Sequence, residues 1–208
     1  MCNDFSATLL RRQFAVSISE EAQPPKMSAT TPSTLTGSWV ADPIHSTAEF
    51  TIKHMVVSTY RTAFKNVEAA LEAEGDDIRL TGTVPVESID IQQPDFRGHV
   101  LSPDFFDVEK NPTITFTSTS VSRGDGDALE VEGDLTVKGV TKPVKATGTI
   151  VGPHENIAGK EVVGIELQTT VDKNDFDLNW NAPLPKGGFA IGDDVTLSVH
   201  LELGRKEA

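Results

Sequence analysis

Three histidines and two carboxylates come nearest to residues that could do chemistry in this chain. His45 and His54 bracket a short alternating stretch, and His99 lies well downstream. Imidazoles of this kind hold zinc or exchange protons near neutral pH. The spacing from His45 to His54 matches no known metal-ligand signature, so we expect no metal site and no catalytic residue here. Asp104 and Asp107 flank two phenylalanines near a turn, a setting more typical of helix capping than of acid–base catalysis.

Signatures of the common enzyme classes are absent from the sequence. It contains no Gly-x-Ser-x-Gly, no His-Glu-x-x-His and no dinucleotide-binding fingerprint. The glycine-containing stretch 133–143 lacks the spacing of a phosphate-binding loop, and no helix is expected to follow it. We therefore expect a protein that binds without turnover and requires no cofactor.

Two strings of residues between 101 and 144 are the most distinctive feature of the chain. Residues 102–107 read Ser-Pro-Asp-Phe-Phe-Asp and lead into a strand-like run at 113–118. Residues 133–144 read Gly-Asp-Leu-Thr-Val-Lys-Gly-Val-Thr-Lys-Pro-Val. Both strings join strand-like alternation to turn residues, and neither offers a nucleophile. This combination indicates a barrel built around an apolar interior.

Runs of alternating apolar and polar residues predict the β-strands that position these side chains. The apolar faces fall at 48–54, 67–73, 78–86, 114–116, 131–137, 144–150, 163–171 and 195–203. Turn residues separate most of these runs, so about eight half-buried strands are predicted, in an all-β antiparallel sandwich or barrel. Residues 94–109 lack alternation and predict a loop with one short helix near 96–101.

The interior of such a barrel is either filled by side chains or hollow enough for one small ligand. Many inward positions are small: Ala48, Ala69, Gly82, Gly133, Ala146 and Gly148. Small residues favour a cavity, although a glycine in a strand equally marks a bulge or a bend. A fully packed barrel that acts through its surface therefore stays open as an alternative.

The charge of the chain excludes some partners. The net charge is −13 at pH 7, and residues 1–35 sum to zero, so the whole excess lies on residues 36–208. An acidic domain repels nucleic-acid phosphates, and charge alone disfavours anionic membranes. No run approaches the roughly 20 apolar residues of a spanning helix, so no stable membrane insertion is expected. The single cysteine, Cys2, supports no disulfide framework.

The N-terminal residues differ in composition from the rest. Residues 28–36 are mostly Ser, Thr, Ala and Pro, which predicts a disordered extension over 1–36 before one domain over 37–208. Two leucines at 9–10 are followed at once by two arginines, a poor export signal, so a cytoplasmic location is expected. Met27 as an alternative start stays open.

In the order of its motifs the chain resembles the YceI-like, polyisoprenoid-binding family. Matching segments are Asp-Pro-x-His-Ser at 42–46, Ser-Ile-Asp at 88–90, residues 102–118, residues 133–144 and the closing residues 172–176 and 192–195. The resemblance covers about residues 38–203. The chain departs from the family pattern at Val56 and Thr62, where glycine is usual, and at Lys173, where arginine is expected.

The resemblance implies a lipocalin-like barrel that binds the isoprenoid tail of a lipid or quinone in a central pore. Family members often dimerise, so a homodimer is an open expectation. Binding, carriage or storage of such a ligand is the predicted function. Two alternatives stay open: an enzyme-like role in which His54 or His45 assists conversion of the bound molecule, and a packed interaction or stress protein without ligand.

Aromatic and histidine side chains are the candidate ligand contacts. The residues are His45, Phe50, Ile52, His54, Phe64, Phe105, Phe106, Phe116, Phe176, Trp180 and Phe189. His54 is either a polar handle for a head group or a core histidine bonded to His45 or Ser46. Because strand neighbours point to opposite faces, only one of Phe105 and Phe106 is expected to face inward. Residues 181–189 are expected to form a mobile flap past which lipid enters, or else a long surface loop.

Overall fold

The structure, a computed structural model, describes residues 35–75 and 77–207. Residues 1–34 of the predicted extension lie outside the described residues, and the first strand begins at Thr36. The strands are β1 (Thr36–Ala41), β2 (Thr47–His54), β3 (Ser58–Phe64), β4 (Glu68–Glu74), β5 (Asp77–Pro85), β6 (Thr113–Arg123), β7 (Ala128–Val137), β8 (Val140–Glu155), β9 (Glu161–Asp172) and β10 (Ile191–Arg205). The helices are α1 (Pro94–Leu101) and the 3-10 turns η1 (Val86–Ser88) and η2 (Lys173–Phe176).

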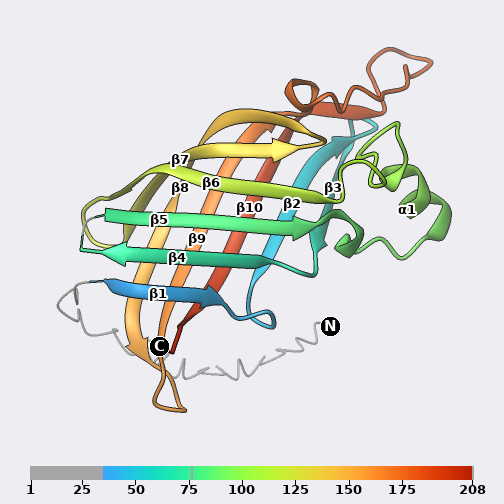
Figure 1. Cartoon of the computed structure of the whole chain (residues 1–208). Helices are drawn as coiled ribbons and strands as arrows, with labels where there is room; N and C mark the ends of the chain where they lie inside the picture. Colours follow the sequence, from blue (N-terminus) through green and yellow to red (C-terminus); the bar gives the residue numbers. More distant parts are fainter. Residues whose placement is uncertain (1–34, 76, 208) are drawn as a thin grey trace, which may run out of the picture. The chain divides into compact units, whose positions relative to one another are not determined.

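Eight of the strands close a barrel. Neighbours pair antiparallel in the order β1, β4, β5, β6, β7, β8, β9 and β10, and β10 returns to pair with β1. Figure 1 shows these strands wrapping around one interior, with α1 at one end. The predicted all-β antiparallel barrel is confirmed, and α1 confirms the helix expected near 96–101.

The hairpin formed by β2 and β3 makes one end of the barrel wider. Strands β1 and β2 both pair with β10: Ala41 lies opposite Leu203, and Thr47 lies opposite His200. On its other side β1 pairs with β4, whereas β2 pairs with β3. The wall therefore splits between β1 and β2, and at one end the two strands β2 and β3 take the place of β1. We call that end the mouth and the opposite end the base.

The Asp-Pro-x-His-Ser motif builds the break between β1 and β2. The Oδ1 atom of Asp42 accepts hydrogen bonds from the backbone amides of Ile44, at 2.7 Å, and His45, at 3.1 Å. These bonds close a tight turn of the kind that aspartate stabilises. The buried Ser46 then fastens the turn to β10, because its hydroxyl bonds both the backbone N–H and the carbonyl of Glu202. The motif is thus structural.

The two adjacent phenylalanines lie in a turn that follows α1. The amide of Phe106 donates to the carbonyl of Val100, at 3.2 Å, and the amide of Asp107 donates to that of Ser102, at 2.9 Å. The loop predicted here is confirmed, but the expectation that only one of Phe105 and Phe106 faces inward is wrong, because it applied strand alternation to a turn. Since a turn does not alternate its side chains, both Phe105 and Phe106 line the interior.

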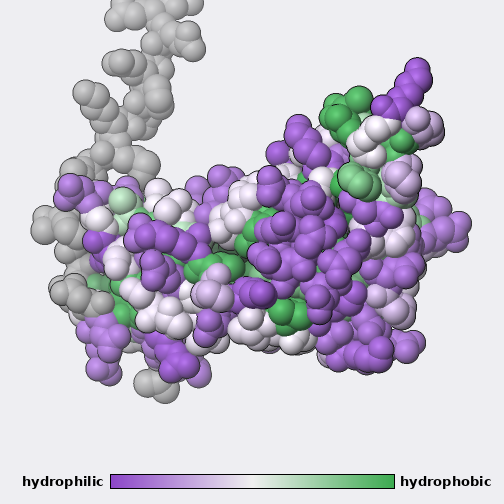
Figure 2. Space-filling model, turned by 90° about the horizontal axis from the view of Figure 1, so that it is seen from above, coloured by the Kyte–Doolittle hydropathy of each residue, from purple (hydrophilic) through white to green (hydrophobic). Residues whose placement is uncertain are grey.

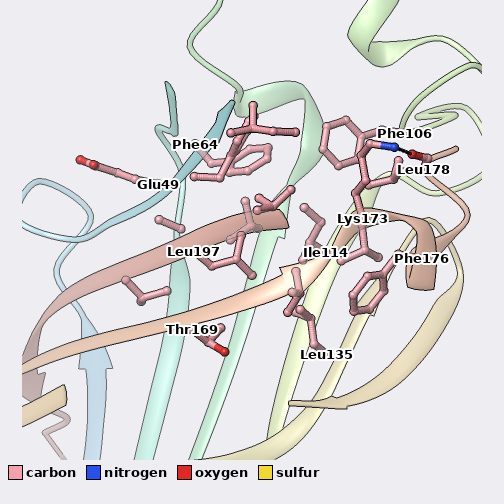
Figure 3. Close-up of a pocket in the computed structure, with 18 of the residues that line it drawn as sticks. Glu49, Phe64, Phe106, Ile114, Leu135, Thr169, Lys173, Phe176, Leu178 and Leu197 are labelled. Carbon is pink, nitrogen blue, oxygen red and sulfur yellow. Dashed lines mark hydrogen bonds between the residues drawn. The ribbon is translucent and has the colours of Figure 1, made fainter. Parts of the chain in front are cut away.

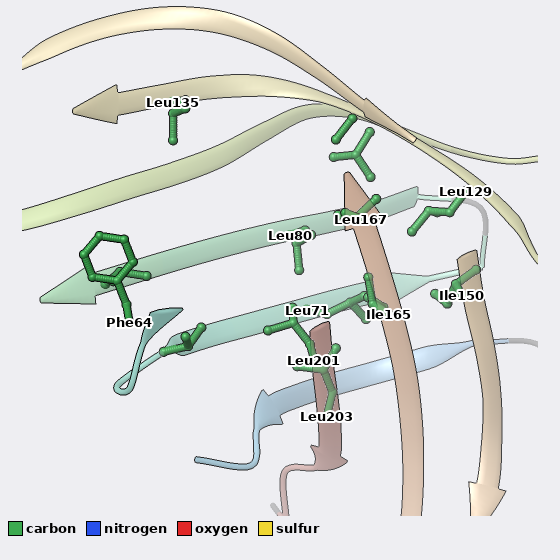
Figure 4. Packing of buried hydrophobic residues seen from close by; sticks show 14 of the residues in the cluster. Phe64, Leu71, Leu80, Leu129, Leu135, Ile150, Ile165, Leu167, Leu201 and Leu203 are labelled. Atoms are coloured by element: carbon green, nitrogen blue, oxygen red, sulfur yellow. The ribbon is translucent and has the colours of Figure 1, made fainter. Parts of the chain in front are cut away.

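The base of the barrel is packed solid. Its innermost side chains are almost inaccessible to solvent: Trp39, Leu71, Val131, Ile150, Val163, Ile165 and Leu203. Figure 4 shows Ile150 of β8, Ile165 of β9, and Leu201 and Leu203 of β10 gathered in this region. Along β10 the inward residues change from the buried Leu201 and Leu203 to the partly exposed Val195, Leu197 and Val199. The interior is therefore closed at the base and more open toward the mouth.

Two of the small residues expected to leave volume instead mark close approaches. A Cβ at Gly133 would lie 2.5 Å from the Phe116 ring, so that ring already fills the space. A Cβ at Gly148 would overlap the backbone carbonyl of Glu166 on β9. The expectation that these two glycines leave interior volume is wrong. Ala48, Ala69, Gly82 and Ala146 do line the interior space.

Candidate ligand-binding cavity

A cavity of about 700 Å³ occupies the mouth half of the barrel. Its walls come from strands β2 to β10, and α1 and the turn after it contribute further residues. Figure 3 shows Phe64, Ile114, Leu135 and Leu197 pointing into one shared space, whereas Glu49 points away from it. A fully packed interior is therefore ruled out for this barrel. Cavities of this size hold small apolar ligands.

Nine of the eleven sequence-predicted contact residues line this cavity. They are Phe50, Ile52, His54, Phe64, Phe105, Phe106, Phe116, Phe176 and Trp180. They come from β2, β3, β6, η2 and two connecting segments that are distant in sequence. Barrel closure brings them together, as the alternation of the strands predicted for Phe50, Ile52 and Phe116. Their contact with a ligand stays a proposal.

His45 does not face the cavity. Its ring lies in the turn between β1 and β2, with Nδ1 3.3 Å from Asp42 Oδ1 and 3.9 Å from Glu202 Oε1. The expected position was wrong because the turn directs this side chain to the outer surface. An enzyme-like role for His45 on a molecule bound inside loses its geometric basis.

The alternative in which His54 bonds His45 or Ser46 is wrong, and the expected position of Phe189 also needs correction. His54 is exposed at the mouth end of β2, whereas His45 and Ser46 precede the other end of that eight-residue strand. At roughly 3.3 Å per residue the two histidines lie too far apart to bond each other or share an ion. Phe189 is 59% exposed and lies outside the main cavity, against a second groove.

Asp42, His45 and Glu202 are a group whose ligand atoms lie within 4.8 Å of one another. The Asp42 carboxylate already accepts the two amide bonds of the turn, and those bonds hold the pKa of that carboxyl below its ordinary value. The negative charge of Asp42 is therefore already stabilised by the backbone amides of the turn. The group on its own gives no reason to invoke a metal.

Aromatic rings surround the mouth side of the cavity. His99 lies edge-on to Phe105, at 5.1 Å between ring centroids, and to Trp180, at 4.9 Å. Tyr60 meets Phe96 of α1 edge-on at 5.6 Å. These pairs have the spacing and tilt that aromatic rings favour, so they connect α1, β3 and the 177–190 segment into one wall.

A buried lysine ties together the two ends of the segment before β10. The Nζ atom of Lys173 donates to Asn174 Oδ1 and to the Leu178 carbonyl, both at 3.0 Å, and lies 3.4 Å from Asp193 Oδ1. Figure 3 shows the contact with Leu178. The Asn174 side chain, followed by the Lys173 charge, holds the pKa of the Asp193 carboxyl below its ordinary value. Lys173 thus fixes the shape of the mouth, and all three of its donors are directed at protein atoms.

The segment expected as a flap, 181–189, forms with Ala190 a short finger that has hydrogen bonds of its own. The Asn181 side chain bonds both the N–H and the carbonyl of Ile191 and so closes the neck of the finger. Within it, the Ala190 amide donates to Ala182 and the Leu184 amide donates to Gly188. The finger is thus a defined element beside the mouth, and its mobility stays a prediction.

Sequence reasoning missed much of the cavity wall. The aliphatic part comprises Ile114, Leu135, Val137, Val144, Val171, Leu178, Val195, Leu197 and Val199. The alternation identified most of these as inward, but it does not separate positions at the packed base from positions at the hollow mouth. Tyr60 and Lys173 carried no local signal of their role.

The sequence of this chain matches a family model and the sequences of known proteins. The family model described as YceI-like domain matches residues 39–203. A UPF0312 protein of Staphylococcus epidermidis is 31% identical over 165 residues, which is 77% of this chain and 94% of that protein. A UPF0312 protein of Staphylococcus aureus is 32% identical over 170 residues, covering 80% of this chain and 96% of the relative.

Solved structures share the fold. BcnA of Burkholderia cenocepacia superposes with a TM-score of 0.67 at 21% identity, over 78% of this chain and 98% of that one. A Campylobacter jejuni YceI protein gives 0.62 at 25% identity, over 74% and 90% of the two chains. A structure from Saccharophagus degradans, described as a polyisoprenoid binding domain, gives 0.63 at 12% identity, over 83% and 100%.

Proposed function

This chain belongs to the YceI-like family, and from that premise we propose that it binds an isoprenoid lipid or isoprenoid quinone for carriage or storage. The observation that carries the proposal is the cavity of about 700 Å³, walled mostly by carbon and closed at the base. The polyisoprenoid-binding description of the Saccharophagus degradans domain supports the same class of ligand.

The chemistry of the wall suits a long apolar tail. Burial of each carbon contributes roughly 0.8 kcal/mol, so a five-carbon isoprene unit gains about 4 kcal/mol before ordering costs. Binding of such a tail requires a cavity of complementary shape that excludes water, and it does not require precisely placed hydrogen bonds. His54 and His99 at the mouth are the polar groups that a head group would meet.

Binding without chemical conversion is part of the proposal. His54 is exposed and lies at the end of a strand, and the ring of His99 is wedged between Phe105 and Trp180. Neither arrangement places a nucleophile beside a base. The homodimer, the preference for a quinone, the absence of a cofactor and the cytoplasmic location stay predictions.

The test is mass spectrometry of the purified protein, first under native conditions and then after extraction with organic solvent. We expect a stoichiometric adduct that extracts as an isoprenoid, or uptake of an added quinone by ligand-free protein. A ligand-free mass from several hosts, with no uptake of added quinones or polyprenyl lipids, contradicts the proposal.

A matched pair of variants locates the ligand. Ala69 faces the cavity, and its neighbour Glu68 is exposed on the outer face of the same strand. Ala69→Trp is expected to remove the adduct while the circular dichroism of the barrel is retained, because the indole fills the ligand volume. Glu68→Trp is expected to keep the adduct. Equal ligand content in the two variants would place the ligand elsewhere.

A further inference from the structure

We propose that an apolar rim at the mouth docks this protein on the surface of a lipid bilayer, so that ligand passes between membrane and cavity without crossing water. The rim consists of Met55, Val56 and Val57, which join β2 to β3, and Phe189 of the finger. The inference rests on the proposed function, because it assigns where the apolar ligand enters.

The apolar side chains of the rim are largely exposed to solvent. Val57 is 87% exposed, Val56 is 65% exposed and Phe189 is 59% exposed. Figure 2 shows green, hydrophobic surface on the projection at the right-hand end, the end at which α1 lies in Figure 1. Grouped exposed apolar side chains on a soluble barrel mark a site of contact with another apolar phase.

Two rim residues have a backbone conformation that is unfavourable for their residue type. Met55 has φ of 50° and Val56 has φ of 66°, in the left-handed region that favours glycine or asparagine. A β-branched residue is especially unfavourable there. Backbone preference therefore gives no reason for valine at position 56, and the residue is 65% exposed. Contact with an apolar surface outside the barrel supplies the missing reason.

The rim is continuous with the ligand cavity. A second groove is lined by Lys53, Val56, Phe189, Ile191, Gly192 and Asp193. Ile191 also lines the main cavity, and so does Met55, the neighbour of Val56. The turn and the finger also touch, since a Cβ at Gly188 would lie 3.0 Å from Val56 Cγ2. A ligand leaving the cavity at this edge would meet apolar side chains first.

Charges beside the rim suit a bilayer with phosphate head groups. Lys53 and Lys186 are exposed next to the apolar residues of the turn and the finger. The nearby Asp193 is paired with the buried Lys173. Ammonium groups at head-group depth and apolar side chains among the acyl chains are the usual arrangement of an interfacial contact. Because the whole chain carries −13, apolar burial must drive the docking, and a neutral lipid surface is the fitting probe.

The experiment measures flotation of ligand-free protein with phosphatidylcholine vesicles. The test variant is Val56→Asn with Phe189→Ser; asparagine accepts the left-handed backbone, so the fold is retained. The control is Ile157→Asn, which removes a fully exposed isoleucine from the turn between β8 and β9 at the base. We expect the double variant to lower the bound fraction at least about tenfold, and the control to match the wild type.

A second readout separates this inference from the proposed function. Quinone binding in detergent micelles is expected to be unchanged in the double variant, whereas the rate of quinone transfer from vesicles falls. Absence of wild-type flotation, or equal flotation of wild type and double variant, overturns the docking proposal. Sedimentation in which the wild type self-associates and the double variant does not, without vesicle binding, overturns it in favour of a second copy on the rim. Vesicle binding without quinone binding in micelles contradicts the proposed function instead.

Discussion

Gly148 and Gly164 lie on neighbouring strands but differ in what surrounds them. A Cβ at Gly148 would overlap the carbonyl of Glu166, whereas a Cβ at Gly164 would meet no atom within 4 Å. Gly148 therefore lets β8 and β9 approach closely, a role that only glycine fills. The sequence alone does not distinguish the surroundings of these two glycines.

We predict that Gly148→Ala destabilises the protein by about 1–3 kcal/mol, because the methyl group must displace backbone. Gly164→Ala is expected to change stability by less than about 0.5 kcal/mol. Unfolding in guanidinium, followed by circular dichroism, measures both. A Gly148→Ala variant as stable as Gly164→Ala would show that β9 shifts at no cost.

Asp193 gives the stability a defined dependence on pH. The Asn174 side chain and the Lys173 ammonium lower the pKa of this carboxyl below 3.8. Because the pKa is lower in the folded state, the stabilisation is present above that value and is lost as pH falls through the folded pKa. We predict that Asp193→Asn flattens the loss of stability as the pH falls below about 5. Urea unfolding across that range measures it, and the exposed Asp194→Asn serves as control; equal slopes for the two variants would refute the assignment.

At the scale of elements, the break between β1 and β2 decides the form of the barrel. Two segments of chain share β10 as a partner end to end, and each has a different second neighbour. Ser46 fills the junction by bonding the backbone of Glu202, where regular pairing stops. Without such a junction the wall could not divide and widen toward the mouth.

We predict that Ser46→Ala destabilises the barrel by about 1–3 kcal/mol, because the backbone N–H of Glu202 loses a buried partner. Ser58→Ala is the matched control, since its hydroxyl bonds the His54 carbonyl on the exposed surface. That variant should change stability by less than about 0.5 kcal/mol. Thermal unfolding compares the two, and similar shifts would mean that water replaces the Ser46 hydroxyl.

At the scale of the whole molecule, the barrel divides its interior between stability and binding. The base holds side chains that are almost fully buried, whereas inward residues near the mouth border empty volume. None of the described helices is long and apolar enough to cross a bilayer. The packed base thus holds the barrel closed while its other half stays hollow.

We predict opposite consequences for two leucines on β10. Leu203 is fully buried at the base, so Leu203→Ala is expected to cost about 2–5 kcal/mol and to leave quinone affinity per folded molecule unchanged. Leu197 borders the cavity, so Leu197→Ala should cost less than half of that but weaken quinone binding. Urea unfolding of ligand-free protein and quinone titration separate the two effects. Equal losses of stability would mean that the cavity collapses around Leu197.

The sequence by itself determined the class of fold, the inward face of most strands and the cavity-facing positions of Phe50, Ile52 and Phe116. Those features follow from a period of two residues, a property of the local backbone that needs no knowledge of the partner strands. The positions of His45, His54 and Phe189 were decided by the tertiary structure, as were the roles of Gly133 and Gly148. Each depends on what a distant segment places beside it: the β10 backbone beside Ser46, the Phe116 ring over Gly133, the Glu166 carbonyl against Gly148. Whether the barrel is packed or hollow was likewise decided only by closure, because one alternation pattern produces both the solid base and the open mouth.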